Sequence, residues 1–174
     1  MKQTRHLIFM SLLVSMALAL HLIERTIPVP FLTAGAKLGL ANLVTVLALY
    51  SLEKKSDVIK IITARLLLSS IFGGSISGLM YGSMGAILSF LVMVGIKEGL
   101  KEKVSIIGVS AAGAVFHNIG QLIVAALIVQ NIGVMMYLPF LSIAGIVTGI
   151  FIGMSANYVM AHMKKLNWPS QIDK

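Results

Sequence analysis

Residues 76–96 read ISGLMYGSMGAILSFLVMVGI, a stretch without a single charged side chain. A helix needs about 20 predominantly apolar residues to cross the hydrocarbon core of a bilayer, and this stretch is long enough. Its apolar residues do not alternate with polar ones at period two, and an open sheet cannot cross lipid because its edges leave backbone groups unpaired. The stretch therefore predicts a membrane-spanning helix.

The composition of the whole chain agrees with this stretch. Of the 174 residues, 57% are hydrophobic and 11% are charged, and the mean hydropathy is +0.95. A soluble domain is about 45–50% apolar and about 25% charged. These values exclude a soluble enzyme, a disordered chain and a nucleic-acid-binding module. The lack of cysteine also excludes disulfides, thiolate metal sites and a catalytic cysteine.

We expect one transmembrane domain, all-α, with six transmembrane helices. They cover roughly residues 7–23, 35–52, 57–73, 76–96, 104–130 and 133–162, followed by a tail over 163–174. The second and third are short for a bilayer, so five helices or a re-entrant segment is the alternative. The N-terminus resembles a signal peptide, with Ala17-Leu18-Ala19 as a cleavage site, but the apolar run continues past that site. We therefore keep this segment as the first helix.

The net charge of +8 comes from basic residues between the expected spans. Six helices with both termini inside place residues 1–6, 52–60, 97–104 and 163–174 in the cytoplasm. Eleven of the 14 basic residues lie there: Lys2, Arg5, Lys54, Lys55, Lys60, Lys97, Lys101, Lys103, Lys164, Lys165 and Lys174. The external loops hold only Arg25, and such asymmetry predicts an N-in, C-in topology. It also removes nucleic acid as a partner and makes the lipid bilayer the surroundings of the protein.

Six polar residues lie in segments that are otherwise apolar: Lys37, Asn42, Arg65, His117, Asn118 and Gln121. A charge at the centre of a bilayer costs at least about 2.5–3.5 kcal/mol, so these side chains should face a cavity or a partner. This set holds two cations and no acid, and we expect Glu24 in an outer loop over residues 24–36. The missing anion is then a ligand, which Lys37 meets as a point charge and Arg65 as a bidentate donor.

Three of these residues also have a simpler interpretation. Lys37 could extend to the outer interface, Arg65 could bond helix carbonyls, and His117 could be a neutral structural hydrogen bonder. The six acids form no aspartate-rich pair, and the chain has no HExxH and no Walker sequence. We therefore expect no catalytic residues, no metal ligands and no cofactor.

Small residues recur four apart in three stretches of the sequence. They are Ser11, Ser15 and Ala19; Gly74, Gly78 and Gly82; and Gly145, Gly149 and Gly153. Such stripes let helix backbones approach closely in lipid. We expect the glycine stripes to pack within the bundle, whereas the stripe of the first helix could equally face another protein.

Four stretches resemble one known family. They are residues 35–42 (GAKLGLAN), Arg65, residues 73–75 (GGS) and residues 117–121 (HNIGQ). They are similar to the family called heptaprenyl diphosphate synthase component I, or Gx transporter family, over roughly residues 7–162. That family looks like the substrate-binding S components of energy-coupling factor (ECF) transporters.

The resemblance implies a six-helix bundle in the plasma membrane of a bacterium, which binds its substrate from outside. It implies as partners a transmembrane coupling protein and two ATPases, which use the ATP. It places the substrate at Lys37 to Asn42, Arg65 and His117 to Gln121. The stripe of Ser11, Ser15 and Ala19 resembles the Ala-xxx-Ala face that S components present to the coupling protein, although two positions here are serine.

The leading expectation takes account of both the name of the family and the chemistry of the residues. The aspartate-rich motif that prenyl diphosphate synthesis needs is missing, but a cationic site in an apolar bundle suits an isoprenoid phosphate. The chain is thus expected to bind an amphiphilic anion for import. The alternatives are a non-catalytic membrane subunit for prenyl diphosphate synthesis and a stand-alone channel or exchanger.

Overall fold

The computed structural model describes residues 2–26, 39–72 and 76–165, and every element in these ranges is helical. The α-helices are α1 (Lys2–Thr26), α2 (Asn42–Ser51), α3 (Lys55–Ile71), α4 (Ile76–Leu100), α5 (Ile106–Val129) and α6 (Leu138–Lys165). Short 3-10 helices precede α5 and α6, η1 (Lys101–Lys103) and η2 (Ile132–Tyr137). The expected all-helical class is confirmed for this part of the chain.

Four segments are long and apolar enough to cross a membrane. They are Thr4–Glu24, Ile76–Lys103, Ile106–Val129 and Ile132–Lys165. The helix α2 is apolar but has only 10 residues, and α3 has 17. Large apolar side chains lie on the outside of the bundle; Ile76 is 83% exposed and Met136 85%. These features are consistent with a multi-pass membrane protein.

Two expected helices begin later than the sequence indicated. The helix expected over residues 35–52 begins only at Asn42, because the chain turns at Gly39, which has a φ of +82°. The turn is closed by the amide of Asn42, which donates to the carbonyl of Gly39 at 2.8 Å. The helix expected from residue 133 begins at Leu138. The segment before it is the 3-10 helix η2, whose start is capped by the side chain of Asn131 accepting from the amide of Gly133 at 2.8 Å.

The first helix is longer than expected. It was expected to end at residue 23, with Glu24 in an outer loop, but α1 continues to Thr26. Glu24 is therefore helical, and it is only 4% exposed. Its position in an outer loop was a wrong expectation, because the helix runs one turn further than the apolar residues do.

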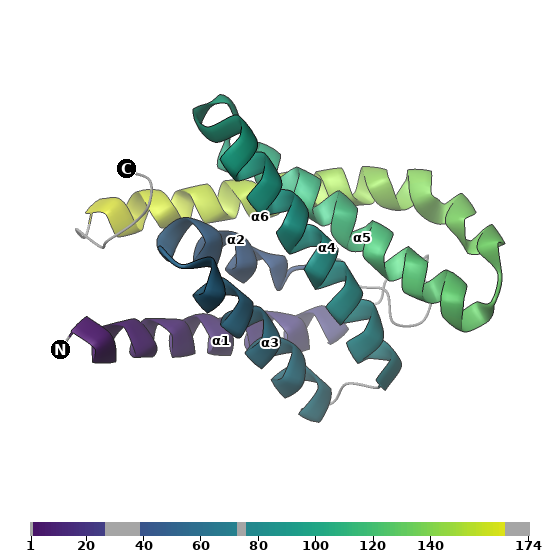
Figure 1. Cartoon of the computed structure of the whole chain (residues 1–174), viewed down its shortest axis with the longest axis horizontal. Coiled ribbons are helices and arrows are strands. Elements are labelled where there is room, and N and C mark those ends of the chain that lie inside the picture. Colours follow the sequence, from purple (N-terminus) through teal and green to yellow (C-terminus); the bar gives the residue numbers. More distant parts are fainter. Residues whose placement is uncertain (1, 27–38, 73–75, 166–174) are drawn as a thin grey trace.

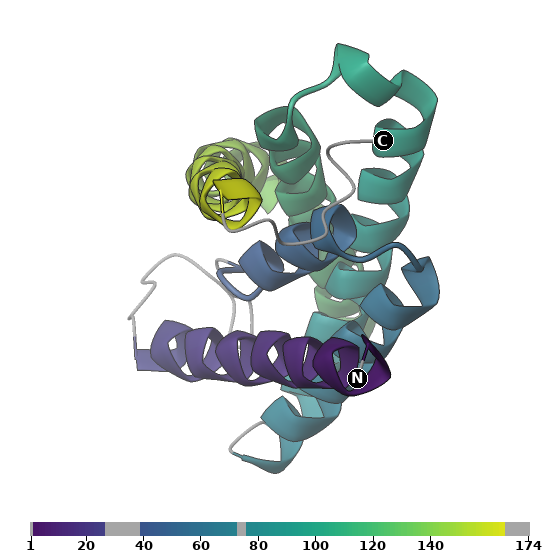
Figure 2. The ribbon, with the colours of Figure 1, turned by 90° about the vertical axis from the view of Figure 1, so that its left-hand side faces the viewer.

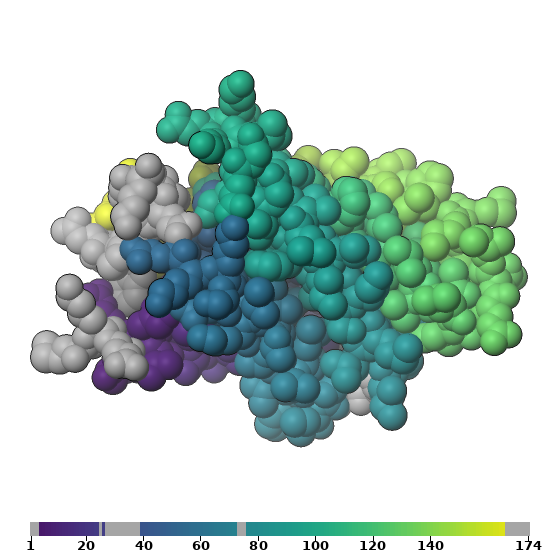
Figure 3. Space-filling model, viewed as in Figure 1, coloured from purple at the N-terminus to yellow at the C-terminus, as the bar shows by residue number. Residues whose placement is uncertain are grey.

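The bundle is built around α2 and α5 (Figures 1 and 2). The helix α5 packs along α4 on one side and along α6 on the other, while α2 lies between α1 and α6. Each helix contributes to one core; representative buried residues are Ala17, Val44, Ile61, Met93, Val109 and Ile152. In the space-filling view, α3 and α4 cover the near face, and α5 and α6 extend beyond them (Figure 3).

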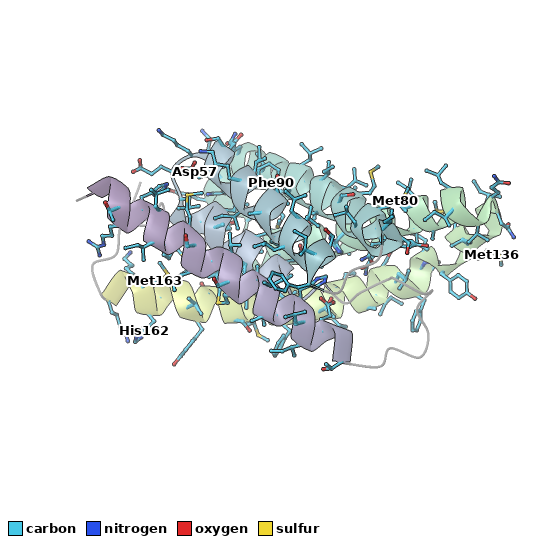
Figure 4. The ribbon with its side chains drawn as sticks, turned by 90° about the horizontal axis from the view of Figure 1, so that it is seen from below. Asp57, Met80, Phe90, Met136, His162 and Met163 are labelled. Atoms are coloured by element: carbon cyan, nitrogen blue, oxygen red, sulfur yellow. The ribbon has the colours of Figure 1, made fainter. Side chains whose placement is uncertain are left out.

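The charged segments gather at one end of the bundle, which we call the charged end (residues 4–6, 52–60, 97–104 and 162–165). The Nε2 atom of His6 lies 3.0 Å from Oδ2 of Asp57 and thereby links α1 to α3. Lys55 pairs with Glu98 and links α3 to α4. Seen from below, Asp57 and His162 lie at this end and Met136 at the opposite one (Figure 4).

Candidate functional site

Gly39 is the point at which the polar side chains of α2 and α5 meet. A Cβ atom at Gly39 would lie 3.4 Å from Nδ2 of Asn42 and 3.5 Å from Cδ2 of His117. Both side chains therefore touch the space beside the Cα atom of Gly39. Asn42 is 4% exposed and His117 is 5% exposed. The structure thus brings together two residues that are far apart in the sequence and that were both expected in the site.

Gln121 extends the cluster by one turn of α5. Its Nε2 atom lies within hydrogen-bond distance, 3.2 Å, of Nε2 of His117. Gly85 of α4 makes room for the ring, since a Cβ atom there would lie 2.8 Å from Nδ1 of His117. The orientation of the imidazole is therefore fixed from two sides.

Arg65 of α3 belongs to the same cluster because its charge interacts with that of Glu24. The guanidinium group is buried, with the residue 5% exposed, and its Nε atom has no hydrogen-bond partner among the described residues. The Glu24 carboxylate attracts the charge of Arg65 and accepts a hydrogen bond from the amide of Gly39. The expectation of two buried cations without an acid was therefore wrong, because Glu24 belongs to the buried set.

We refer to Glu24, Gly39, Asn42, Arg65, His117 and Gln121 as the polar cluster. Nδ2 and Oδ1 of Asn42 also lack a partner within the described ranges. A buried polar atom without a partner costs about 1–3 kcal/mol, more for a charged group. At 1.5 Å per residue, Arg65 lies about 15 Å along α3 from Lys55, and His117 lies about 17 Å along α5 from Ile106. The cluster is therefore deep in the bundle and offers unused donors to a polar or anionic group.

Two expected site residues are not part of the cluster as described. Nδ2 of Asn118 donates to the carbonyl oxygen of Leu141 at 2.8 Å and lies beside Gly145, so this side chain faces α6 and holds it to α5. Lys37 lies outside the described residues. Its place in the site stays a prediction.

Glu24 is the residue that the sequence reasoning missed. It lies seven residues after Ala17, which is fully buried, and a spacing of seven puts two residues on the same face of a helix. That spacing could have placed Glu24 on the inner face of α1. The composition of residues 24–36, with its two prolines, led instead to a loop.

A concave region lies at the charged end. Four lysines and three glutamates line it together with apolar residues: Lys55, Lys97, Lys101, Lys103, Glu53, Glu98 and Glu102. The Nζ atom of Lys97 donates to the carbonyl oxygen of Leu49 at 2.6 Å and lies 4.5 Å from the centre of the Tyr50 ring. Lys55 with Glu98 and Lys97 with Leu49 join helices to one another here, and the mixed sign of the charges indicates no class of ligand.

No three His, Asp or Glu side chains of the described ranges lie close enough together to hold a metal ion. The described chain is therefore a helical protein suited to a membrane, with one buried polar cluster. It belongs to the family of heptaprenyl diphosphate synthase component I, whose family model matches residues 13–159. This confirms the family that the sequence motifs indicated. No curated protein and no solved structure matches the chain.

Proposed function

We propose that this protein is the substrate-binding membrane subunit, or S component, of an ECF-type importer. The observation that carries the proposal is the pair of buried groups with unused hydrogen-bonding atoms, Arg65 and Asn42, in an otherwise apolar bundle. Intramembrane ionisable residues mark substrate pathways in many membrane proteins, because burying a charge there is costly. The chain itself is expected to catalyse no reaction.

The substrate class follows from the chemistry around these groups. A guanidinium group and an amide suit an oxyanion such as a phosphate, which accepts several hydrogen bonds at once. The surrounding apolar side chains suit a hydrocarbon tail. An isoprenoid phosphate or a related precursor has both parts, and Lys37 would add a second cation to the site.

The proposed topology has six crossings, with both termini in the cytoplasm of a bacterium. The helices α2 and α3 would then cross together with their flanking residues. The charged end carries the basic loops, which favours the cytoplasmic side for that end. The substrate would enter from the opposite, external side. On the outer surface of α1, Ser11, Ser15 and Ala19 are exposed and would contact the coupling protein, whose two ATPases use ATP.

A binding experiment tests the site. We expect the purified full-length protein in lipid nanodiscs to bind farnesyl monophosphate, and Asn42→Ala and Arg65→Gln each to weaken binding at least about tenfold through lost hydrogen bonds. Asn157 is exposed on α6, so Asn157→Ala is the matched control and should bind as the wild type does. Melting temperatures show whether each variant is folded. Wild-type affinity in both site variants would contradict the proposed site.

The second candidate function is a non-catalytic membrane subunit associated with heptaprenyl diphosphate synthesis. The description of the family favours it. The two functions differ in their partners. An S component should copurify from its native membrane with a coupling protein and two ATPases, whereas a synthase subunit should copurify with a catalytic prenyl diphosphate synthase.

A further inference from the structure

Glu24 is an unexpected residue in a site for an anion. Its carboxylate is 4% exposed, accepts from the amide of Gly39 and attracts Arg65, the guanidinium that the proposed ligand needs. A neutral amide oxygen would serve the amide of Gly39 equally well, and the cluster already contains two amide side chains, Asn42 and Gln121. The negative charge at this position therefore does more than accept the hydrogen bond from Gly39.

The charge has a direct consequence for an anionic ligand. A head group that reaches the amide of Asn42, unpartnered among the described residues, lies beside Gly39, whose own amide donates to Glu24. In a poorly solvated bundle the two negative charges repel each other strongly. This repulsion grows with the charge of the head group. The same carboxylate stabilises Arg65 while no ligand is bound, because an isolated buried cation is costly.

Resting on the proposed function, we infer that Glu24 is a specificity-determining residue of the ligand site. It balances Arg65 in the empty protein and selects against highly charged head groups, so that the site prefers a prenyl monophosphate to the corresponding diphosphate. The two compounds share the same tail and differ by about one unit of negative charge, so the carboxylate of Glu24 rather than the apolar lining is the basis of the choice.

The experiment measures binding of farnesyl monophosphate and farnesyl diphosphate, with EDTA present, to the full-length protein in nanodiscs. We expect the wild type to bind the monophosphate more tightly. Glu24→Gln, which keeps an acceptor for Gly39, should tighten the monophosphate about tenfold and the diphosphate about thirtyfold. Glu102→Gln makes the same change of net charge at the charged end and should change neither affinity.

The outcomes separate the inference from the proposed function. A wild type that binds neither compound contradicts the proposed function. A wild type that binds, combined with a Glu24→Gln protein of unchanged or lower affinity, or with an equal change for both compounds, overturns only the inference. Glu24→Asp retains the charge and should keep the preference for the monophosphate. Loss of that preference in Glu24→Asp would also overturn the inference, and melting temperatures show whether each variant is folded.

Discussion

The polar cluster depends on the backbone of one residue, Gly39. Its amide donates to Glu24, and the space beside its Cα atom is shared by Asn42 and His117. The φ of +82° is a conformation that residues with a Cβ atom rarely adopt. A change at this residue therefore disturbs three side chains of the cluster without touching any of them chemically.

Replacing Gly39 by alanine should destabilise the protein through this backbone conformation. We expect a loss of about 1–2 kcal/mol, because the positive φ is strained for alanine, whereas the added Cβ atom itself would meet only ordinary contacts. The measurement is the apparent melting temperature in detergent. Gly99→Ala is the control, since nothing lies within 4 Å of a Cβ atom at that position in α4. Equal melting temperatures for the two variants would contradict this role of Gly39.

At the scale of helices, α5 has two small-residue faces that lead to different neighbours. Gly113 and Gly120 lie against α4, on the side that also carries His117. Asn118 lies against α6, where Gly145, Gly149 and Gly153 approach the backbone of α5. The expected packing of this glycine stripe within the bundle is therefore confirmed. The adjacent residues His117 and Asn118 serve different interfaces because neighbouring positions of a helix point about 100° apart.

Close contact between α5 and α6 requires glycine at position 149. A Cβ atom there would lie 2.5 Å from the Cα atom of Ala111 and 2.9 Å from the carbonyl oxygen of Ser110, and both of these are backbone atoms that cannot turn aside. We expect Gly149→Ala to cost about 1–3 kcal/mol, as overpacking of a close interface does. Thermal unfolding followed by helical circular dichroism measures the loss. Gly95→Ala, with open space around its Cβ atom in the interior of α4, should unfold at the wild-type temperature or slightly above it, because alanine favours the helix more than glycine does.

The sequence predicted the apolar helices well because their length and lack of charge leave few alternatives in lipid. It predicted less well where a helix begins or ends, since Gly39 and Asn131 set those points through local backbone geometry and capping. It also could not show which face of α5 each polar residue occupies relative to its neighbours. The burial of Glu24 was missed for a related reason. The helix continues beyond the apolar run, and only the packing of that helix against its neighbours shows that the acid is buried.

At the scale of the whole molecule, the charged groups lie at one end of the bundle, and the polar cluster lies deep inside it. The charged end joins α1, α3 and α4 through pairs such as His6 with Asp57 and Lys55 with Glu98. The opposite end carries the exposed apolar residues of η2, including Met136 (Figure 4). The basic residues thus mark one surface of the bundle, and this separation makes the proposed orientation testable without a ligand.

Because the chain has no cysteine, single introduced cysteines report the side of the membrane directly. Glu102→Cys is exposed at the charged end, and Ile132→Cys, 82% exposed in η2, lies between α5 and α6. If the basic loops are cytoplasmic, a membrane-impermeant maleimide should label Ile132→Cys in intact cells and Glu102→Cys only after permeabilisation. A permeant maleimide should label both variants, and the cysteine-free wild type should remain unlabelled. The reverse labelling pattern would show that the protein has the opposite orientation in the membrane. The polar cluster would then be reached from the cytoplasm, as a subunit of a cytoplasmic synthase would require.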